Sequence, residues 1–158
     1  MSAAAHTPLA PFLDAARAAA TRAGVFGETL AKADALVCAA PESAAPAEYR
    51  LFTDAGALWV GLFTADRWLS QSIEQDLVHT GDKLEELMEE ELADQQEPKP
   101  AQPPKFEHFR DDDKVFTFRT RLPFGPADAS AGERAARWLL ACEAMFRNLG
   151  DMQGGDED

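Results

Sequence analysis

The sequence has few of the residues that mark a disulfide-linked or membrane-spanning protein. Its 158 residues include only two cysteines, Cys38 and Cys142, which form no close-spaced motif. Because the chain is long enough to bury a core without covalent links, we expect reduced, buried thiols, with a disulfide as the alternative. No apolar run approaches the roughly 18 residues of a membrane span. The sequence has no basic segment followed by an apolar stretch, so we expect no secretory signal. These absences predict a cytoplasmic protein.

Basic residues are scarce as well. The chain has 15 Lys and Arg against 28 Asp and Glu, which gives a formal net charge of −13. A nucleic-acid binder needs surplus cations to neutralise phosphates, and an anionic membrane surface attracts cations too, so neither partner is expected. With 46% hydrophobic residues the chain should fold. We expect a single domain over residues 1–150, followed by a disordered acidic tail at 151–158.

Catalytic motifs are absent from the sequence. There is no glycine-rich phosphate loop, no G-x-S-x-G elbow, no H-E-x-x-H and no C-x-x-C pair. The histidines are His6 near the start, His79 near an expected helix break and His108 in an expected strand, and nothing brings them together. We therefore predict a non-enzymatic protein with no catalytic residue and no cofactor.

Strand patterns occupy the first half of the chain. Residues 48–53 and 58–63 are rich in aromatic and β-favouring residues, and residues 54–56 between them predict a tight turn. The second strand has apolar residues on both faces, which predicts a central strand covered on both sides. Residues 33–39 also read as a strand, although their alanines suit a helix.

Helical patterns flank these strands. The first helix spans residues 8–23 with Thr7 as its N-cap, and the last begins at a capping box of Ser130 and Glu133. Between them lies a long helical segment at 66–97, with a candidate break at 80–82 and eleven acidic against two basic residues.

A proline-rich linker and a second hairpin complete the pattern. Four prolines in residues 97–104 exclude helix and sheet there. Residues 106–109 and 115–121 then alternate as two strands around an acidic turn. Three consecutive carboxylates at Asp111, Asp112 and Asp113 could hold Ca²⁺ or Mg²⁺. The simpler interpretation is a solvated turn, because Asp is a favoured turn residue.

The candidate partner surface lies on the long helical segment. Like charges repel at (i, i+4) spacing, as in the pairs formed by Glu85, Glu86, Glu89 and Glu90, so their density favours an acidic surface for a basic protein partner. The alternative is the solvated face of an amphipathic helix. Trp68 lies off the apolar stripe of this segment and is a candidate interface anchor if it is exposed.

The order of elements resembles the type III secretion chaperone-like fold, which includes class I effector chaperones and bacterial YbjN-type domains. The resemblance rests on the two hairpins, at 49–63 and 106–121, and on a closing helix with Trp138, Leu139, Cys142 and Phe146. It implies a non-enzymatic, commonly dimeric domain that presents a sheet or a helix-lined groove to another polypeptide.

The sequence thus predicts an α+β domain with a mainly antiparallel sheet of about five strands, in the order α-β-β-β-α-β-β-α. The terminal helices should cover one face, and the long acidic helix the other face or an edge. The expected function is binding of a protein partner, as a chaperone-like or regulatory adaptor, with self-association through strand edges or helix faces. The alternative is a small-molecule or metal-binding sensor.

Overall fold

A computed structural model describes residues 9–32, 34–41, 43 and 45–152, and it confirms the α+β class. Its sheet is six-stranded and antiparallel throughout, with the strand order β1-β2-β3-β4-β6-β5. The elements in chain order are α1 (Ala10–Ala23), β1 (Thr29–Ala31), β2 (Ala35–Ala39), β3 (Glu48–Asp54), β4 (Ala57–Thr64), α2 (Arg67–Thr80), α3 (Leu84–Asp94), β5 (Phe106–Arg110), β6 (Phe116–Arg121) and α4 (Ala129–Arg147).

The sheet contains one strand that the sequence did not predict. β1 has only three residues and pairs with β2, Leu30 lying opposite Val37. So short a strand carries no alternation that a sequence pattern could reveal. β2 itself confirms the strand interpretation of this region.

The predicted β3–β4 hairpin is confirmed. Ala55 and Gly56 connect the strands with φ angles of 53° and 78°, the left-handed pair that the tightest hairpin turns require. β4 lies in the middle of the sheet, as predicted. At its centre Gly61 allows β6 to approach, since an added Cβ would lie 2.5 Å from the carbonyl oxygen of Phe118.

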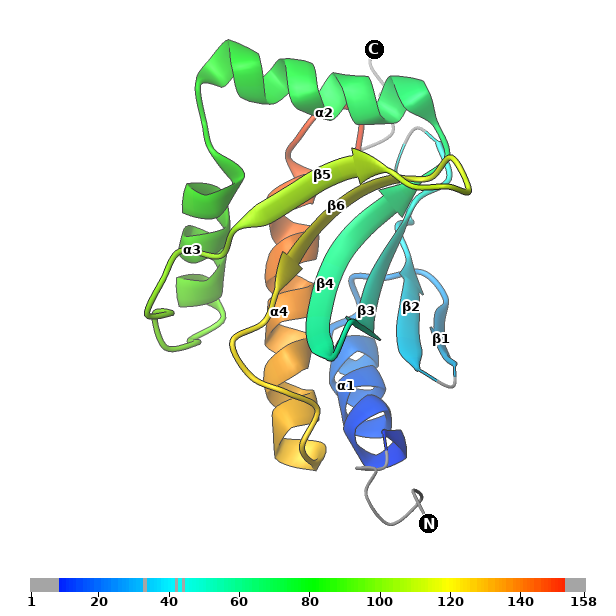
Figure 1. Ribbon diagram of the computed structural model, residues 1–158, viewed down its shortest axis with the longest axis vertical. Helices are drawn as coiled ribbons and strands as arrows, with labels where there is room; N and C mark the ends of the chain where they lie inside the picture. Colours follow the sequence, from blue (N-terminus) through cyan, green and yellow to red (C-terminus); the bar gives the residue numbers. More distant parts are fainter. Residues whose placement is uncertain (1–8, 33, 42, 44, 153–158) are drawn as a thin grey trace.

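The two terminal helices cover one face of the sheet, as predicted (Figure 1). They approach each other closely at Gly132, where an added Cβ would lie 2.3 Å from the carbonyl oxygen of Phe12. The largest fully buried side chains fill the space between these helices and the sheet and include Phe12, Leu36, Tyr49, Leu51, Leu58, Leu62, Phe118, Trp138 and Phe146. Both cysteines are free and buried in this core, as expected for reduced thiols.

The long acidic segment is two helices, and it does not cross the second face of the sheet. The break falls at Gly81, which adopts a φ of 79°, near the position that the sequence indicated. α3 packs beside α4, on the β5 side of the sheet, and α2 runs across the end of α4 (Figure 1). Glu74 of α2 pairs with His108, and the His108 ring stacks on Phe118, which is buried in the core beneath the terminal helices. α2 therefore lies on the same side of the sheet as α1 and α4. Neither helix is available to cover the other face.

One capping prediction differs from the structure. α4 begins at Asp128, whose carboxylate accepts a hydrogen bond from the Ala131 amide at 2.9 Å, so Ser130 lies inside the helix rather than at its cap. The predicted cap Thr7 lies outside the described residues. Met152, which the sequence assigned to the acidic tail, is buried against the core. Residues 153–158 lie outside the description. Within the described ranges, no helix has the length and apolarity needed to cross a bilayer.

Candidate functional site

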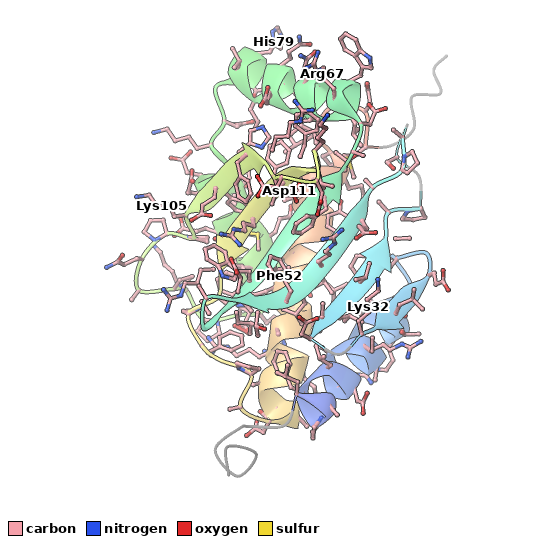
Figure 2. The ribbon with its side chains drawn as sticks, turned by 45° about the vertical axis from the view of Figure 1, so that its right-hand side comes forward. Lys32, Phe52, Arg67, His79, Lys105 and Asp111 are labelled. Carbon is pink, nitrogen blue, oxygen red and sulfur yellow. The ribbon has the colours of Figure 1, made fainter. Side chains whose placement is uncertain are left out.

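The outward face of the sheet carries no helix in the described part of the chain, and it is the main candidate surface. Figure 2 shows this face turned towards the reader, with Phe52 near its middle. The strand register identifies its residues: inward Leu62 lies opposite inward Phe118, so the neighbouring pair of Gly61 and Arg119 points outward. The same alternation in the other strand pairs identifies the remaining side chains that point outward. The outward residues include Val37, Arg50, Phe52, Trp59, Phe63, Glu107, Phe109, Arg119 and Arg121.

Arg119 lies at the centre of a network on this face. Its Nη1 donates to Asp54 Oδ2 at 2.8 Å, and its Nε donates to Glu107 Oε1 at 2.9 Å. The guanidinium carbon lies 3.9 Å from the centroid of the Trp59 ring and 5.3 Å from that of Phe109, within cation–π range. Burial alone would lower the pKa of Arg119, but the hydrogen bonds that its guanidinium donates to Asp54 and Glu107 outweigh it and raise the pKa above its usual value. The network holds two aromatic rings in fixed positions.

A second arginine covers the other half of β4. The guanidinium carbon of Arg50 lies 4.2 Å from the Phe63 ring centroid, and Arg50 also pairs with Glu48. Phe52 meets Phe63 edge-on, with centroids 5.5 Å apart. As a result Phe63 is only 6% exposed. The prediction that β4 is covered on both sides is thus met by neighbouring side chains on this face and not by a secondary-structure element.

The outward face has the aromatic residues and arginines typical of a protein interface, and the carboxylates on it, Glu48, Asp54 and Glu107, pair with those arginines. An open antiparallel sheet face is ordinarily polar, whereas interface centres are enriched in aromatic residues and arginine and depleted in other charges. Leu30 is 42% and Phe109 38% exposed at its two sides. Large apolar side chains spread over one open face indicate a binding surface.

The four predicted glutamates of α3 do not act alike. Glu85 accepts a hydrogen bond from the backbone amide of Phe106 at 3.1 Å, so it anchors the start of β5. Glu86, Glu89 and Glu90 line a hollow of about 490 Å³ together with Leu92, Ala93, Glu97, Lys99 and Pro100. None of these three glutamates forms an ion pair within the described residues. The structure therefore gathers three of the four into an acidic hollow with apolar parts.

Trp68 is exposed, but it lies apart from that hollow. It belongs to α2, its side chain is 70% exposed, and it does not line the acidic hollow. It satisfies the condition set for an interface anchor, namely exposure. The predicted surface is thus divided between two helices.

The Asp111–Asp113 run behaves as a turn. Asp111 Oδ1 accepts hydrogen bonds from the amides of Asp113 and Val115, each at 2.9 Å, which closes the β5–β6 connection. Over the ranges that the structure describes, no group of three or more His, Cys, Asp or Glu side chains is arranged to hold a metal ion. The turn interpretation therefore accounts for these residues.

Comparison with known proteins gives no match: no protein-family model, no curated protein and no solved structure is significantly similar to this chain.

Sequence reasoning missed the outward sheet face because it allowed the long acidic helix to cover either that face or an edge of the sheet. A signal was present, since Arg50, Phe52, Arg119 and Arg121 occupy alternating positions in two predicted strands. An arginine–aromatic alternation beside an apolar alternation indicates a second face with a composition of its own. The sequence did not indicate which face of the sheet the helices would cover.

Proposed function

We propose that this chain is a non-enzymatic domain that binds another polypeptide on the outward face of its sheet, as a chaperone-like or regulatory adaptor. One observation supports this proposal above the others. The face that no described helix covers carries Phe52, Trp59 and Phe109 together with arginines paired to carboxylates, an aromatic content that a simply solvated sheet face would not need.

The fixed geometry of this face favours binding. Arg119 is held by two carboxylates and in turn holds the Trp59 and Phe109 rings, so a partner would meet side chains that are already ordered. Ordering before binding lowers the entropy lost on association. Aromatic residues and arginine are also the side chains that contribute most to interface energies.

The acidic hollow supplies a second contact in this proposal. The carboxylates of Glu86, Glu89 and Glu90 have no ion-pair partner among the described residues, and Leu92 and Pro100 add an apolar lining. A lysine or arginine side chain of the partner fits this combination, since its stem is apolar and its head is charged. The partner is accordingly expected to carry a basic segment, which agrees with the net charge of −13.

This function is the one that the resemblance to the type III secretion chaperone-like fold implies. Self-association is part of the same proposal. The short β1 and the exposed β5 form the two edges of the sheet, and a second copy could add strands there.

The test is an affinity pull-down from the native host lysate with matched variants. Phe52→Asp and Phe109→Asp place a charge on the outward face, and we expect each to abolish capture of a partner that the unchanged protein holds stoichiometrically. Val78→Asp is the control, because Val78 is 83% exposed on α2 and belongs to neither candidate surface. Equal loss with Val78→Asp, or retention with both phenylalanine variants, contradicts the outward face as the binding surface.

The same experiment at two salt concentrations tests the acidic hollow. Glu89→Gln with Glu90→Gln removes two charges while keeping side-chain size, and we expect weaker capture and a smaller loss as salt rises. An unchanged salt dependence would remove the hollow from the proposal and leave the sheet face in it.

A further inference from the structure

A second hollow, larger than the acidic one, lies beside one end of the sheet. Its volume is about 660 Å³, against about 490 Å³ for the acidic hollow. Four segments form it: the β3–β4 turn, residues 101–105 before β5, residues 121–125 after β6, and α4. Its lining is mostly apolar and includes Leu58, Pro103, Pro104, Pro123, Phe124 and Trp138. A mostly apolar concavity with a few polar groups is the usual form of a small-ligand site.

The charged residues that line this hollow are all cationic. They are Lys105 and Arg121, and no Asp or Glu is among the lining residues. Neither cation forms an ion pair in the described part of the chain. In a protein with a net charge of −13, two cations without a partner at one hollow are a local reversal of charge. The ligand that complements them is an anion.

A buried donor in the wall of the hollow has no acceptor. The indole Nε1 of Trp138 is the one buried side-chain polar atom without a hydrogen-bond partner over the described residues. Trp138 is 1% exposed, and its ring meets that of Phe124 edge-on with centroids 6.5 Å apart. A buried donor left without an acceptor costs about 1–3 kcal/mol, so such donors are few in native proteins and each one has a cause.

We propose that this hollow binds a carboxylate attached to an apolar group. The carboxylate lies between Lys105 and Arg121, where charge-assisted hydrogen bonds form, and the apolar group lies against the prolines and Phe124. An oxygen of the ligand accepts the hydrogen bond of the Trp138 indole, since Trp138 also lines the hollow. Of the outward-face residues named above, only Arg121 also lines this hollow, so the site extends the proposed function and does not depend on it.

The carboxylate could belong to a small organic acid or to the C-terminus of a peptide. The two sources share the chemistry that the hollow recognises. We therefore use phenylacetate as the small-acid probe and acetyl-Ala-Ala-Phe, with its free carboxylate, as the peptide probe. Their neutral counterparts are phenylacetamide and the same peptide with an amidated C-terminus.

The readout is the indole N–H resonance of Trp138 in the ¹⁵N-labelled full chain. The sequence contains three tryptophans, so three such signals are expected, and Trp59→Phe and Trp68→Phe assign them. We expect a carboxylate probe to shift the Trp138 signal saturably while its neutral counterpart binds at least about tenfold more weakly. A peptide that binds more tightly than phenylacetate identifies a polypeptide ligand, and equal affinities identify a small acid; either result supports the site.

Substitutions of the exposed residues Lys105 and Arg121 test the two cations without disturbing the core. Arg121→Gln and Lys105→Gln should each weaken binding of the carboxylate probe about tenfold. Lys83→Gln is the control, since it removes the same charge at the start of α3, outside the lining of this hollow. Trp138→Phe removes the donor, and its effect on affinity is read alongside these variants in case it alters folding.

Three results would overturn the proposal. One is no shift of the Trp138 signal with either carboxylate. Another is equal binding of the acid and its amide, which would show an apolar site indifferent to charge. The third is rapid exchange of the indole proton with water and no effect of any probe, which would show that a buried water satisfies the donor.

Discussion

Arg134 of α4 donates from Nε to a Glu97 oxygen at 2.9 Å, and so connects the closing helix to a residue 37 positions earlier. The Glu97 side chain is fully buried, whereas that of Arg134 is 38% exposed. Arg137 Nη1 approaches the same carboxylate at 3.5 Å. The start of the proline-rich segment is thereby fixed to α4 by two arginines. No sequence pattern connected these three residues.

This arrangement predicts that the two arginines act together. Replacing Arg134 or Arg137 by Met leaves Glu97 one cation, and we expect each single variant to lose about 1 kcal/mol of unfolding free energy. The double variant leaves a buried carboxylate unpaired and should lose about 3–5 kcal/mol, more than the two single losses combined. Urea unfolding of the four proteins measures this, with Arg67→Met as an exposed control. Additive losses would show that Glu97 does not need a cation.

Gly132 predicts an effect opposite to helix propensity. Gly→Ala inside a helix ordinarily stabilises by about 1 kcal/mol. Here the new Cβ would lie 2.3 Å from the Phe12 carbonyl oxygen and 3.0 Å from Ala15 Cβ, so α1 must move. We expect Gly132→Ala to destabilise the protein by about 1–3 kcal/mol in thermal or urea unfolding. Gly125→Ala is the control, because a Cβ there meets nothing within 4 Å. A stabilised Gly132→Ala protein would contradict the close helix contact.

The buried thiols predict a loss of stability at alkaline pH. Burial raises the pKa of Cys38 from 9.0 to about 12 and raises that of Cys142 as well. Above about pH 9 the unfolded chain releases thiol protons that the folded chain retains, so unfolding free energy falls as pH rises, by about 1.4 kcal/mol per pH unit for each thiol. Urea unfolding under reducing conditions between about pH 8 and about pH 10 checks this sign.

The variant Cys38→Ala separates the contribution of the Cys38 thiol to this pH dependence from those of other groups. Cys38→Ala lowers stability at every pH because it leaves a cavity, but its stability should decline less steeply with pH. Burial also raises the pKa of Tyr49, so part of the decline should remain. A slope unchanged by the variant would assign the pH dependence to other groups.

Two of the three tryptophans, Trp68 and Trp138, predict different effects on folding and binding. Trp68 is 70% exposed, so Trp68→Ala should change unfolding free energy by less than about 0.5 kcal/mol. Trp138 is 1% exposed, and Trp138→Ala should cost about 3–5 kcal/mol. If Trp68 is an interface anchor, Trp68→Ala together with Glu86→Lys reduces partner capture in the pull-down while the protein remains folded. Unchanged capture would remove Trp68 and Glu86 from the binding surface.

Local patterns were sufficient for most elements. The Ala55–Gly56 turn, the end of the first helix at residue 23 and the break within 80–82 depend on a few adjacent residues, and the structure has each where the sequence placed it. β1 could not be predicted, because three residues hold no period. The cap of α4 was misplaced by two residues because Asp128 and Ser130 are both good caps, and only the geometry of the preceding loop selects one.

The sequence by itself determined every element except β1, together with the inward residues and the acidity of α3, because these follow from side-chain periodicity and charge along the chain. The tertiary structure alone decided that all four helices lie on one side of the sheet, since helix docking depends on contacts between residues far apart, such as Phe12 with Gly132 and Glu97 with Arg134. That choice left the arginine–aromatic face uncovered. It also brought Lys105, Arg121 and Trp138 to one hollow, because three separate segments meet there only after the sheet and α4 have packed.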